Sequence, residues 1–322
     1  MSQLKGRDLL FLDEFSGEEI IQILDLADRL KTERKKSIFN PLLANKTLAL
    51  IFQKPSTRTR VSFEIAMKDL GGNTVSLNSS EIQLARGETI EDTAKTLSRY
   101  VDAIMARVSR HNDITELTKY ATIPVINGLT DLYHPTQVLA DLQTIREKKG
   151  RLEGLKLAWI GDGTNVCNTL LIGCSKTGID MTVASPPDYK PHSDAYGLAK
   201  REAERKAVSI ELVEEPEEAA KNADIIVTDT FISMGSDSER KERLKIFLPK
   251  YQVNSSLMSR ANSDAIFMHC LPAHRGEEVT NEVIDGSISA VWDEAENRLH
   301  SQKALLCLLL LDESSLSQYA ST

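Results

Sequence analysis

The stretch that decides the fold is Phe52-Gln53-Lys54-Pro55-Ser56-Thr57-Arg58-Thr59-Arg60-Val61-Ser62-Phe63-Glu64. A short apolar run of strand length, Thr47–Phe52, leads into it, and apolar residues at helical spacing continue as far as Gly71-Gly72. The stretch therefore predicts a strand, a tight turn and a helix. Pro55 restricts the chain just before the helix, and Ser56 or Thr57 stands where an N-cap residue belongs.

The start of this predicted helix has the features of an anion site. Its first backbone N–H groups and the positive end of its dipole both favour a bound anion. Ser56 to Arg60 supply three hydroxyls and two arginines, whose planar forks match phosphate oxygens. An arginine in the first turn interacts unfavourably with the helix dipole and destabilises the helix by ~0.3–1 kcal/mol. A bound polyanion would reverse this effect. The alternative is a capped helix with a solvated basic first turn.

Length and composition bound the class of protein. A chain of 322 residues can form two domains, and 41% hydrophobic with 27% charged residues is typical of soluble globular proteins. The formal net charge of −8 argues against general binding to nucleic acid or anionic membranes. No run approaches the ~20 apolar residues of a membrane span, and the N-terminus does not resemble a signal peptide. The four cysteines show no C-x-x-C spacing, which favours a reducing, cytoplasmic setting without a zinc site.

Strand-like and helical runs alternate along the chain, which predicts parallel sheets with crossover helices. The expected strands are Thr47–Phe52, Thr74–Leu77, Asp102–Ala106, Ile123–Asn127, Leu155–Ile160, Met181–Ala184, Ile210–Val213, Asp224–Thr228 and Ala265–His269. The expected helices lie near 15–35, 57–70, 89–99, 112–120, 135–149, 165–178, 194–208, 216–222, 238–247 and 295–311.

A polar stop at Glu147-Lys148-Lys149-Gly150 marks the expected domain boundary. We therefore expect an α/β protein with two doubly wound parallel-sheet domains, residues 1–150 and 151–299, and an active-site cleft between them. The apolar C-terminal helix, about residues 300–322, should pack back on the first domain.

Several polar residues follow the predicted strands, where open α/β sheets bind ligands. Arg107 ends one strand, although it could also be an exposed arginine. His134 precedes Pro135 at a helix start, where a histidine tends to stay neutral and can donate one hydrogen bond to a carbonyl, or can simply cap the helix. Asp229 could bind a substrate ammonium or cap a turn. Cys270 could be core filling.

The turn Gly161-Asp162-Gly163-Thr164-Asn165-Val166 follows an apolar strand and opens a helix. It invites a dinucleotide interpretation, but Val166 occupies the position of the third glycine, and no clear acidic ribose partner follows at the expected distance. The indication of an NAD site is weak.

Five motifs, in the same order over nearly the whole chain, resemble those of the aspartate/ornithine carbamoyltransferases. They are Ser56–Arg60, His134-Pro135-Thr136-Gln137, Gly161–Asn165, Ser233-Met234-Gly235 and His269-Cys270-Leu271-Pro272. The last two are typical of the ornithine type. Two positions depart from the family pattern: Thr164, where relatives commonly have asparagine, and Thr230-Phe231, where they often have a bulkier pair.

The resemblance implies transfer of a carbamoyl group from carbamoyl phosphate to the δ-amine of ornithine, without a metal or organic cofactor. It implies that the catalytic residues are Arg107, His134, Asp229 and Cys270. The implied carbamoyl phosphate ligands are Ser56, Thr57, Arg58, Thr59, Gln83, Arg107, His134, Gln137, Cys270, Leu271 and Arg298. The implied ornithine ligands are Asn165, Asp229, Ser233 and Met234.

The resemblance also implies a homotrimer, or a multiple of one, in which Gln83 reaches the site of a neighbouring subunit. Arg298, which by itself would pass for a surface residue, would come from the second domain. Other hypotheses are a different amine acceptor, such as putrescine or a modified ornithine, and a non-catalytic sensor of phosphate metabolites. The Ser-Met-Gly motif favours an α-amino acid, and the retention of Cys270, Asp229 and His134 disfavours a sensor. An NAD-dependent dehydrogenase is more distant.

Overall fold

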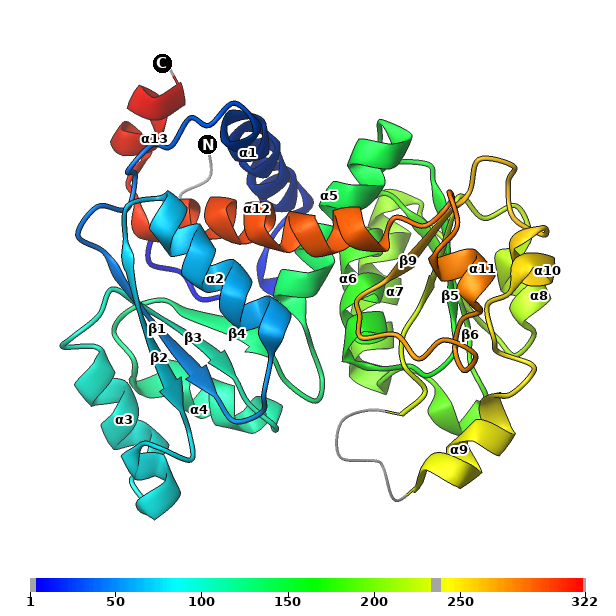
Figure 1. Cartoon of the computed structure of the whole chain (residues 1–322), viewed down its shortest axis with the longest axis horizontal. Coiled ribbons are helices and arrows are strands. Elements are labelled where there is room, and N and C mark those ends of the chain that lie inside the picture. Colours follow the sequence, from blue (N-terminus) through cyan, green and yellow to red (C-terminus); the bar gives the residue numbers. More distant parts are fainter. Residues whose placement is uncertain (1–3, 233–238, 321–322) are drawn as a thin grey trace. The chain divides into compact units, whose positions relative to one another are not determined.

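A computed structural model describes residues 4–232 and 239–320 of the chain (Figure 1). They form two compact units, Met1–Ala140 with Asn297–Thr322, and Asp141–Glu296. The chain passes between the units inside α5 (Pro135–Lys149) and again inside α12 (Val291–Leu310). The expected bounds, 1–150 and 151–299, differ from these because a polar stop marks where a helix ends, whereas packing decides which unit each half of the helix joins.

The first unit is built on a four-stranded parallel sheet with strand order β2-β1-β3-β4. The strands are β1 (Thr47–Phe52), β2 (Asn73–Asn78), β3 (Ala103–Arg107) and β4 (Val125–Leu129). The helices that belong wholly to this unit are α1 (Gly17–Lys35), α2 (Thr57–Asp69), α3 (Ile90–Leu97), α4 (His111–Tyr120) and α13 (Glu313–Ala320), with 3-10 turns η1 (Leu12–Glu14) and η2 (Gln83–Arg86).

Both faces of this sheet are covered, as a parallel sheet requires. On one face Ala49 and Ile51 of β1 pack with Ala94 of α3 and with Ile114 and Leu117 of α4. The alternate β1 residues on the other face are buried as well. The carboxyl ends of β1, β3 and β4 therefore lie side by side, since these strands are neighbours and run in parallel.

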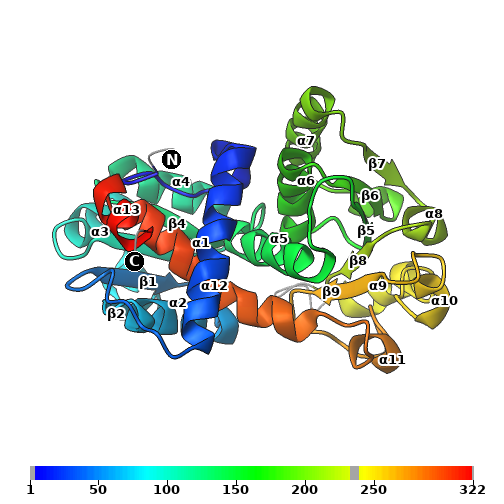
Figure 2. The same ribbon diagram turned by 90° about the horizontal axis from the view of Figure 1, so that it is seen from above.

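The second unit carries a five-stranded parallel sheet with strand order β7-β6-β5-β8-β9 (Figure 2). The strands are β5 (Lys156–Ile160), β6 (Asp180–Ala184), β7 (Ile210–Val213), β8 (Ile225–Thr228) and β9 (Ile266–His269). The helices are α6 (Asn165–Thr177), α7 (Ser193–Lys206), α8 (Pro216–Ala220), α9 (Arg240–Phe247), α10 (Ser255–Met258) and α11 (Asn281–Ile284), with the 3-10 turn η3 (Pro187–Tyr189).

The predicted α/β class and both parallel sheets are confirmed, and β1 has the predicted bounds. Three helices were not expected. The helices α10 and α11 are single turns, too short to show a 3.6-residue period, and α13 lies beyond the apolar run that guided the prediction. Within the described residues, no helix is both long and apolar enough to span a bilayer.

Candidate active site

The helix α2 begins as predicted, with Ser56 as its N-cap. The Thr59 backbone N–H donates to Ser56 Oγ at 3.3 Å, and the first turn contains no acidic residue. Arg58 is partly buried, whereas Arg60 is exposed and pairs with Glu64 at 3.0 Å along the helix surface. Of the two arginines, Arg58 therefore remains the candidate anion ligand.

Two further predicted residues follow the strands next to β1. Arg107 ends β3 and is only 7% exposed, so the alternative of a surface arginine is wrong. His134 lies between β4 and α5 and is 4% exposed. Together with Ser56, which follows β1, these residues lie after three neighbouring parallel strands, at the edge where open α/β sheets bind ligands.

Arg298 joins this group from α12, in the part of that helix that belongs to the first unit. Its Nη1 donates to Gln137 Oε1 at 2.6 Å, and its Nη2 donates to Thr59 Oγ1 at 3.1 Å. Arg298 is 2% exposed, so the expectation that it looks like a surface residue is wrong. Three residues that are far apart in sequence, Thr59, Gln137 and Arg298, are thus in direct contact.

The electrostatics of this group favour a neutral histidine among cations. Burial lowers the pKa of His134 well below 6.5, and the positive charges of Arg298, Arg107 and Arg58 lower it further. A neutral imidazole can donate a single hydrogen bond, and three guanidinium groups close to one buried ring create a strongly positive site. We name Ser56, Arg58, Arg107, His134 and Arg298 the cationic group.

The loop that carries His134 is held by side chains that the sequence did not single out. Asn127, wholly buried, donates to the Leu10 carbonyl at 2.8 Å. Thr130 Oγ1 accepts from the Tyr133 N–H at 3.2 Å and lies 3.1 Å from His111 Nδ1. One feature of the sequence could have indicated such a supporting side chain: Asn127 is a polar residue in an otherwise apolar predicted strand.

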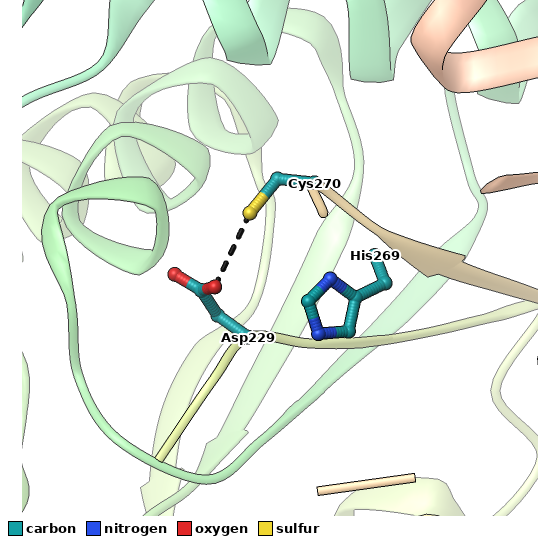
Figure 3. A group of neighbouring side chains, drawn as sticks. All are labelled: Asp229, His269 and Cys270. Atoms are coloured by element: carbon teal, nitrogen blue, oxygen red, sulfur yellow. Dashed lines mark hydrogen bonds between the residues drawn. The ribbon is translucent and has the colours of Figure 1, made fainter. Parts of the chain in front are cut away.

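In the second unit, Asp229 follows β8 and faces Cys270, which follows β9 (Figure 3). The Cys270 thiol donates to Asp229 Oδ1 at 3.2 Å, and the Thr230 backbone N–H donates to the same oxygen at 2.7 Å. Burial, reinforced by the negative charge of Asp229, raises the pKa of the Cys270 thiol well above 9.0. Cys270 is therefore a neutral hydrogen-bond donor and not a thiolate.

The turn Gly161–Asn165 lies beside the same carboxylate. Thr164 Oγ1 donates to Asp229 Oδ2 at 3.1 Å, and Asn165 opens α6. A Cβ atom on Gly163 would lie 2.2 Å from the Pro191 backbone nitrogen, and Gly161 has a φ of +122°. Close packing and backbone geometry therefore account for both glycines without a dinucleotide.

A partly buried ion pair connects this turn to α9. Arg243 pairs with Asp162 and donates from Nε to the Phe231 carbonyl at 2.6 Å. Burial raises the pKa of Asp162 to about 6, although Arg243 acts in the opposite direction. The contact joins the Gly161–Asn165 turn to the segment that follows Asp229.

His269 supports the turn after β9. Its Nδ1 accepts from the Leu271 N–H at 2.9 Å, and its Nε2 lies 3.1 Å from Glu278 Oε1, with both side chains wholly buried. Ligand atoms of Asp229, His269 and Cys270 lie within 4.8 Å of one another, as metal ligands can. Both His269 ring nitrogens already have partners, so a metal here would have to displace one of them.

Leu271 has a φ of +58°, a left-handed conformation that is rare for leucine.

The remaining predicted ligands lie outside the cationic group. Thr57 is exposed in the first turn of α2, and Gln83 is exposed at the start of η2. Cys270 and Leu271 belong to the second unit, so their expected contact with carbamoyl phosphate stays a prediction. Ser233 and Met234 lie outside the described residues.

Comparison with protein families matches nearly the whole chain. Residues 7–147 match the aspartate/ornithine carbamoyltransferase carbamoyl-P binding domain, and residues 153–309 match the Asp/Orn binding domain.

Individual relatives are similar over almost their full lengths. The ornithine carbamoyltransferase of Carboxydothermus hydrogenoformans is 54% identical over 310 residues, which cover 96% of this chain and 99% of that protein. The ornithine carbamoyltransferase of Pyrococcus horikoshii is 56% identical over 307 residues, or 95% of this chain and 96% of that protein. The solved structure of ornithine carbamoyltransferase from Pyrococcus furiosus has a TM-score of 0.94 at 54% identity, covering 96% of this chain and 99% of that one.

Proposed function

Because the chain belongs to the aspartate/ornithine carbamoyltransferase family, we propose that it transfers the carbamoyl group of carbamoyl phosphate to the δ-amine of L-ornithine. The products are L-citrulline and phosphate. The observation that carries the proposal is the cationic group, in which the charges of three arginines act on the buried His134 and lower its pKa further. This combination suits a substrate with a phosphate at one end and an uncharged carbonyl at the other.

The phosphate is bound at the start of α2. Backbone N–H groups, the hydroxyls of Ser56 and Thr57, and the fork of Arg58 are its donors. Arg298 already donates to Thr59 and Gln137, and it can exchange these neutral acceptors for a charged phosphate oxygen. A charged phosphate oxygen is a stronger acceptor for this guanidinium than the two neutral oxygens.

The carbamoyl oxygen gains negative charge as its carbon is attacked. Arg107, Thr59 and neutral His134 are the donors for this oxygen, and they are fixed before the reaction begins. A protonated His134 would add a fourth cation to the three arginines, and their positive charges disfavour it. Gln137 contacts the carbamoyl amide from the first turn of α5.

Ornithine binds to the Asp229 side of the second unit. Asp229, Asn165, Ser233 and Met234 hold its α-amino and carboxylate ends. The δ-amine, whose pKa in a free alkyl ammonium is near ~10.4, must lose a proton before it can attack. Asp229 is the base that takes up this proton, and Cys270 acts by donating a hydrogen bond to Asp229. The N–C bond then forms as the C–O bond to phosphate breaks, and the attacking nitrogen passes its second proton to the leaving phosphate.

We propose that the protein works as a homotrimer, or a multiple of one, in the cytoplasm. The exposed position of Gln83 supports a contact with a neighbouring subunit, because a glutamine in a surface turn can reach another chain. The four cysteines are all free, which suits a reducing compartment. The roles above are filled by protein groups, without a metal or organic cofactor.

The test is citrulline formation by the purified protein from carbamoyl phosphate and ornithine, with a chelator present. Saturable turnover is the expected result, and replacing ornithine with putrescine should abolish it. Binding of carbamoyl phosphate without turnover of ornithine would contradict the acceptor assignment. Failure to bind carbamoyl phosphate at all would contradict the role of the cationic group.

A further inference from the structure

The carboxylate of Asp229 accepts hydrogen bonds on both oxygens. Oδ1 accepts hydrogen bonds from the Cys270 thiol at 3.2 Å and from the Thr230 N–H at 2.7 Å. Oδ2 accepts one from the Thr164 hydroxyl at 3.1 Å. In Figure 3 the second oxygen of Asp229 points away from Cys270. Of the side-chain donors to this carboxylate, Thr164 is therefore the one that acts on the side opposite Cys270.

Thr164 occupies the N-cap position of α6, where a threonine side chain would ordinarily cap the helix. It is the N-cap residue of α6, with φ −69° and ψ 179°, yet its hydroxyl makes no capping hydrogen bond. A threonine at this position normally accepts from an N–H of the first helical turn. Here the hydroxyl instead donates to a residue 65 positions further along the chain. The local helix therefore gives up a cap, and Asp229 gains a donor.

We propose that Thr164 is a positioning residue for Asp229 in the transfer reaction. By holding Oδ2, it fixes the plane of the carboxylate, so that the face directed to the substrate amine keeps one orientation. A carboxylate has about four acceptor sites, so three donors leave room for an ammonium or amine N–H. The proposal rests on the proposed function, since it assumes that Asp229 contacts the δ-amine of ornithine.

The proposal explains how the chain tolerates threonine at this position of the family motif. The asparagine common in relatives carries an amide N–H that can donate to the same oxygen, so either residue can supply the hydrogen bond. Valine has the shape of threonine without a donor, and serine keeps the donor without the methyl group. These two substitutions separate a hydrogen-bonding role from a packing role.

The test is steady-state kinetics on four variants of the full-length protein: Thr164→Val, Thr164→Ser, Thr164→Asn and Thr177→Val. Thr177 is a matched control, because it lies on the same helix and its hydroxyl bonds the Gly173 carbonyl of that helix, at 2.8 Å. Thr164→Val should lower kcat/KM for ornithine by about 10- to 100-fold, the effect of one lost hydrogen bond to a charged group. Its Kd for carbamoyl phosphate should change less than about twofold, and Thr164→Ser and Thr164→Asn should stay within about fivefold of the parent.

A packing role predicts the reverse order, with the valine variant active and the serine variant impaired, and that result would overturn the proposal. Equal losses in ornithine kinetics and in carbamoyl phosphate binding would also overturn it, because they would indicate general damage. If the parent protein forms no citrulline, the proposed function fails and this inference falls with it. If the parent is active and Thr164→Val is unimpaired, only the inference fails.

Discussion

Arg58 and Arg60 show how two identical side chains in one helical turn differ in their surroundings. Arg60 is exposed and already pairs with Glu64, whereas Arg58 is partly buried and contributes to the low pKa of His134. Arg58→Ala should therefore raise the Kd for carbamoyl phosphate about 100-fold or more, the loss of a bidentate, charge-assisted contact. Arg60→Ala is the matched control and should stay within about threefold. Isothermal titration of both variants checks this, and equal affinities would contradict the assignment.

Cys270 acts as a thiol in this structure, and its role can be separated from that of a thiolate base. Its raised pKa and its contact with Asp229 make it a donor. Cys270→Ser keeps a donor and should retain more kcat than Cys270→Ala, for which we expect a loss of about tenfold or more. The Kd for carbamoyl phosphate should change less than kcat in both variants. Equal inactivation by serine and alanine would instead support a thiolate.

The low pKa of His134 predicts how stability depends on pH. The folded pKa lies below 6.5, so below that pH the unfolded chain binds a proton that the folded chain excludes. Stability due to this residue is therefore complete above about pH 6.5 and falls as the pH drops towards the folded pKa, by at most ~1.4 kcal/mol per pH unit. His134→Gln should weaken this acid dependence, measured by urea unfolding at pH 5 and pH 7. Identical slopes in the parent protein and in His134→Gln would contradict the prediction.

The helix α2 couples local stability to ligand binding. Ser56 accepts the Thr59 N–H, so Ser56→Ala should lower the free energy of unfolding by ~1 kcal/mol. Ser62, on the same helix, donates to the Thr59 carbonyl at 3.3 Å and caps nothing, so Ser62→Ala should cost less. Urea unfolding without ligand measures both changes. A larger loss for Ser62→Ala would show that the cap contributes little.

Local pattern was enough to predict most elements but not the contacts between them. The run Thr47–Phe52 and the turn after it predicted β1 and α2, because a strand period and an N-cap are properties of neighbouring residues. Arg298 shows the limit of this approach. Its partners Gln137 and Thr59 lie 161 and 239 residues away in sequence, so its burial depends on packing that no local pattern encodes.

The same limit applies to the second unit. The sequence predicts that Asp229 and Cys270 each follow a strand, and their contact follows from the pairing of β8 with β9. The Arg243–Asp162 pair was not expected, because Arg243 reads as one of several charged residues on a polar helix. The family motifs predict which residues bind substrate or react, whereas the contacts that support those residues can be seen only in the folded structure.

At the scale of the whole molecule, the trimer hypothesis makes a prediction about mixed assemblies. Arg58→Ala and Gln83→Ala proteins should each have little activity. If Gln83 serves the site of a neighbouring subunit, a cyclic trimer that contains both variants has one site with an intact Arg58 and an intact neighbouring Gln83. Random mixing of equal amounts should then restore about a quarter of the parent activity, since about three quarters of the trimers are mixed and one site in three is complete.

The control is a mixture of Arg58→Ala with Arg107→Ala. Both residues belong to the cationic group of a single chain, so no arrangement of these two variants gives a complete site. Co-expression with two different affinity tags isolates the mixed assemblies, and light scattering gives their mass. Recovery in the Gln83 mixture alone supports a site shared between subunits. If neither mixture recovers while light scattering shows mixed trimers, Gln83 acts within its own chain or not at all, and its assignment as a ligand from a neighbour is wrong.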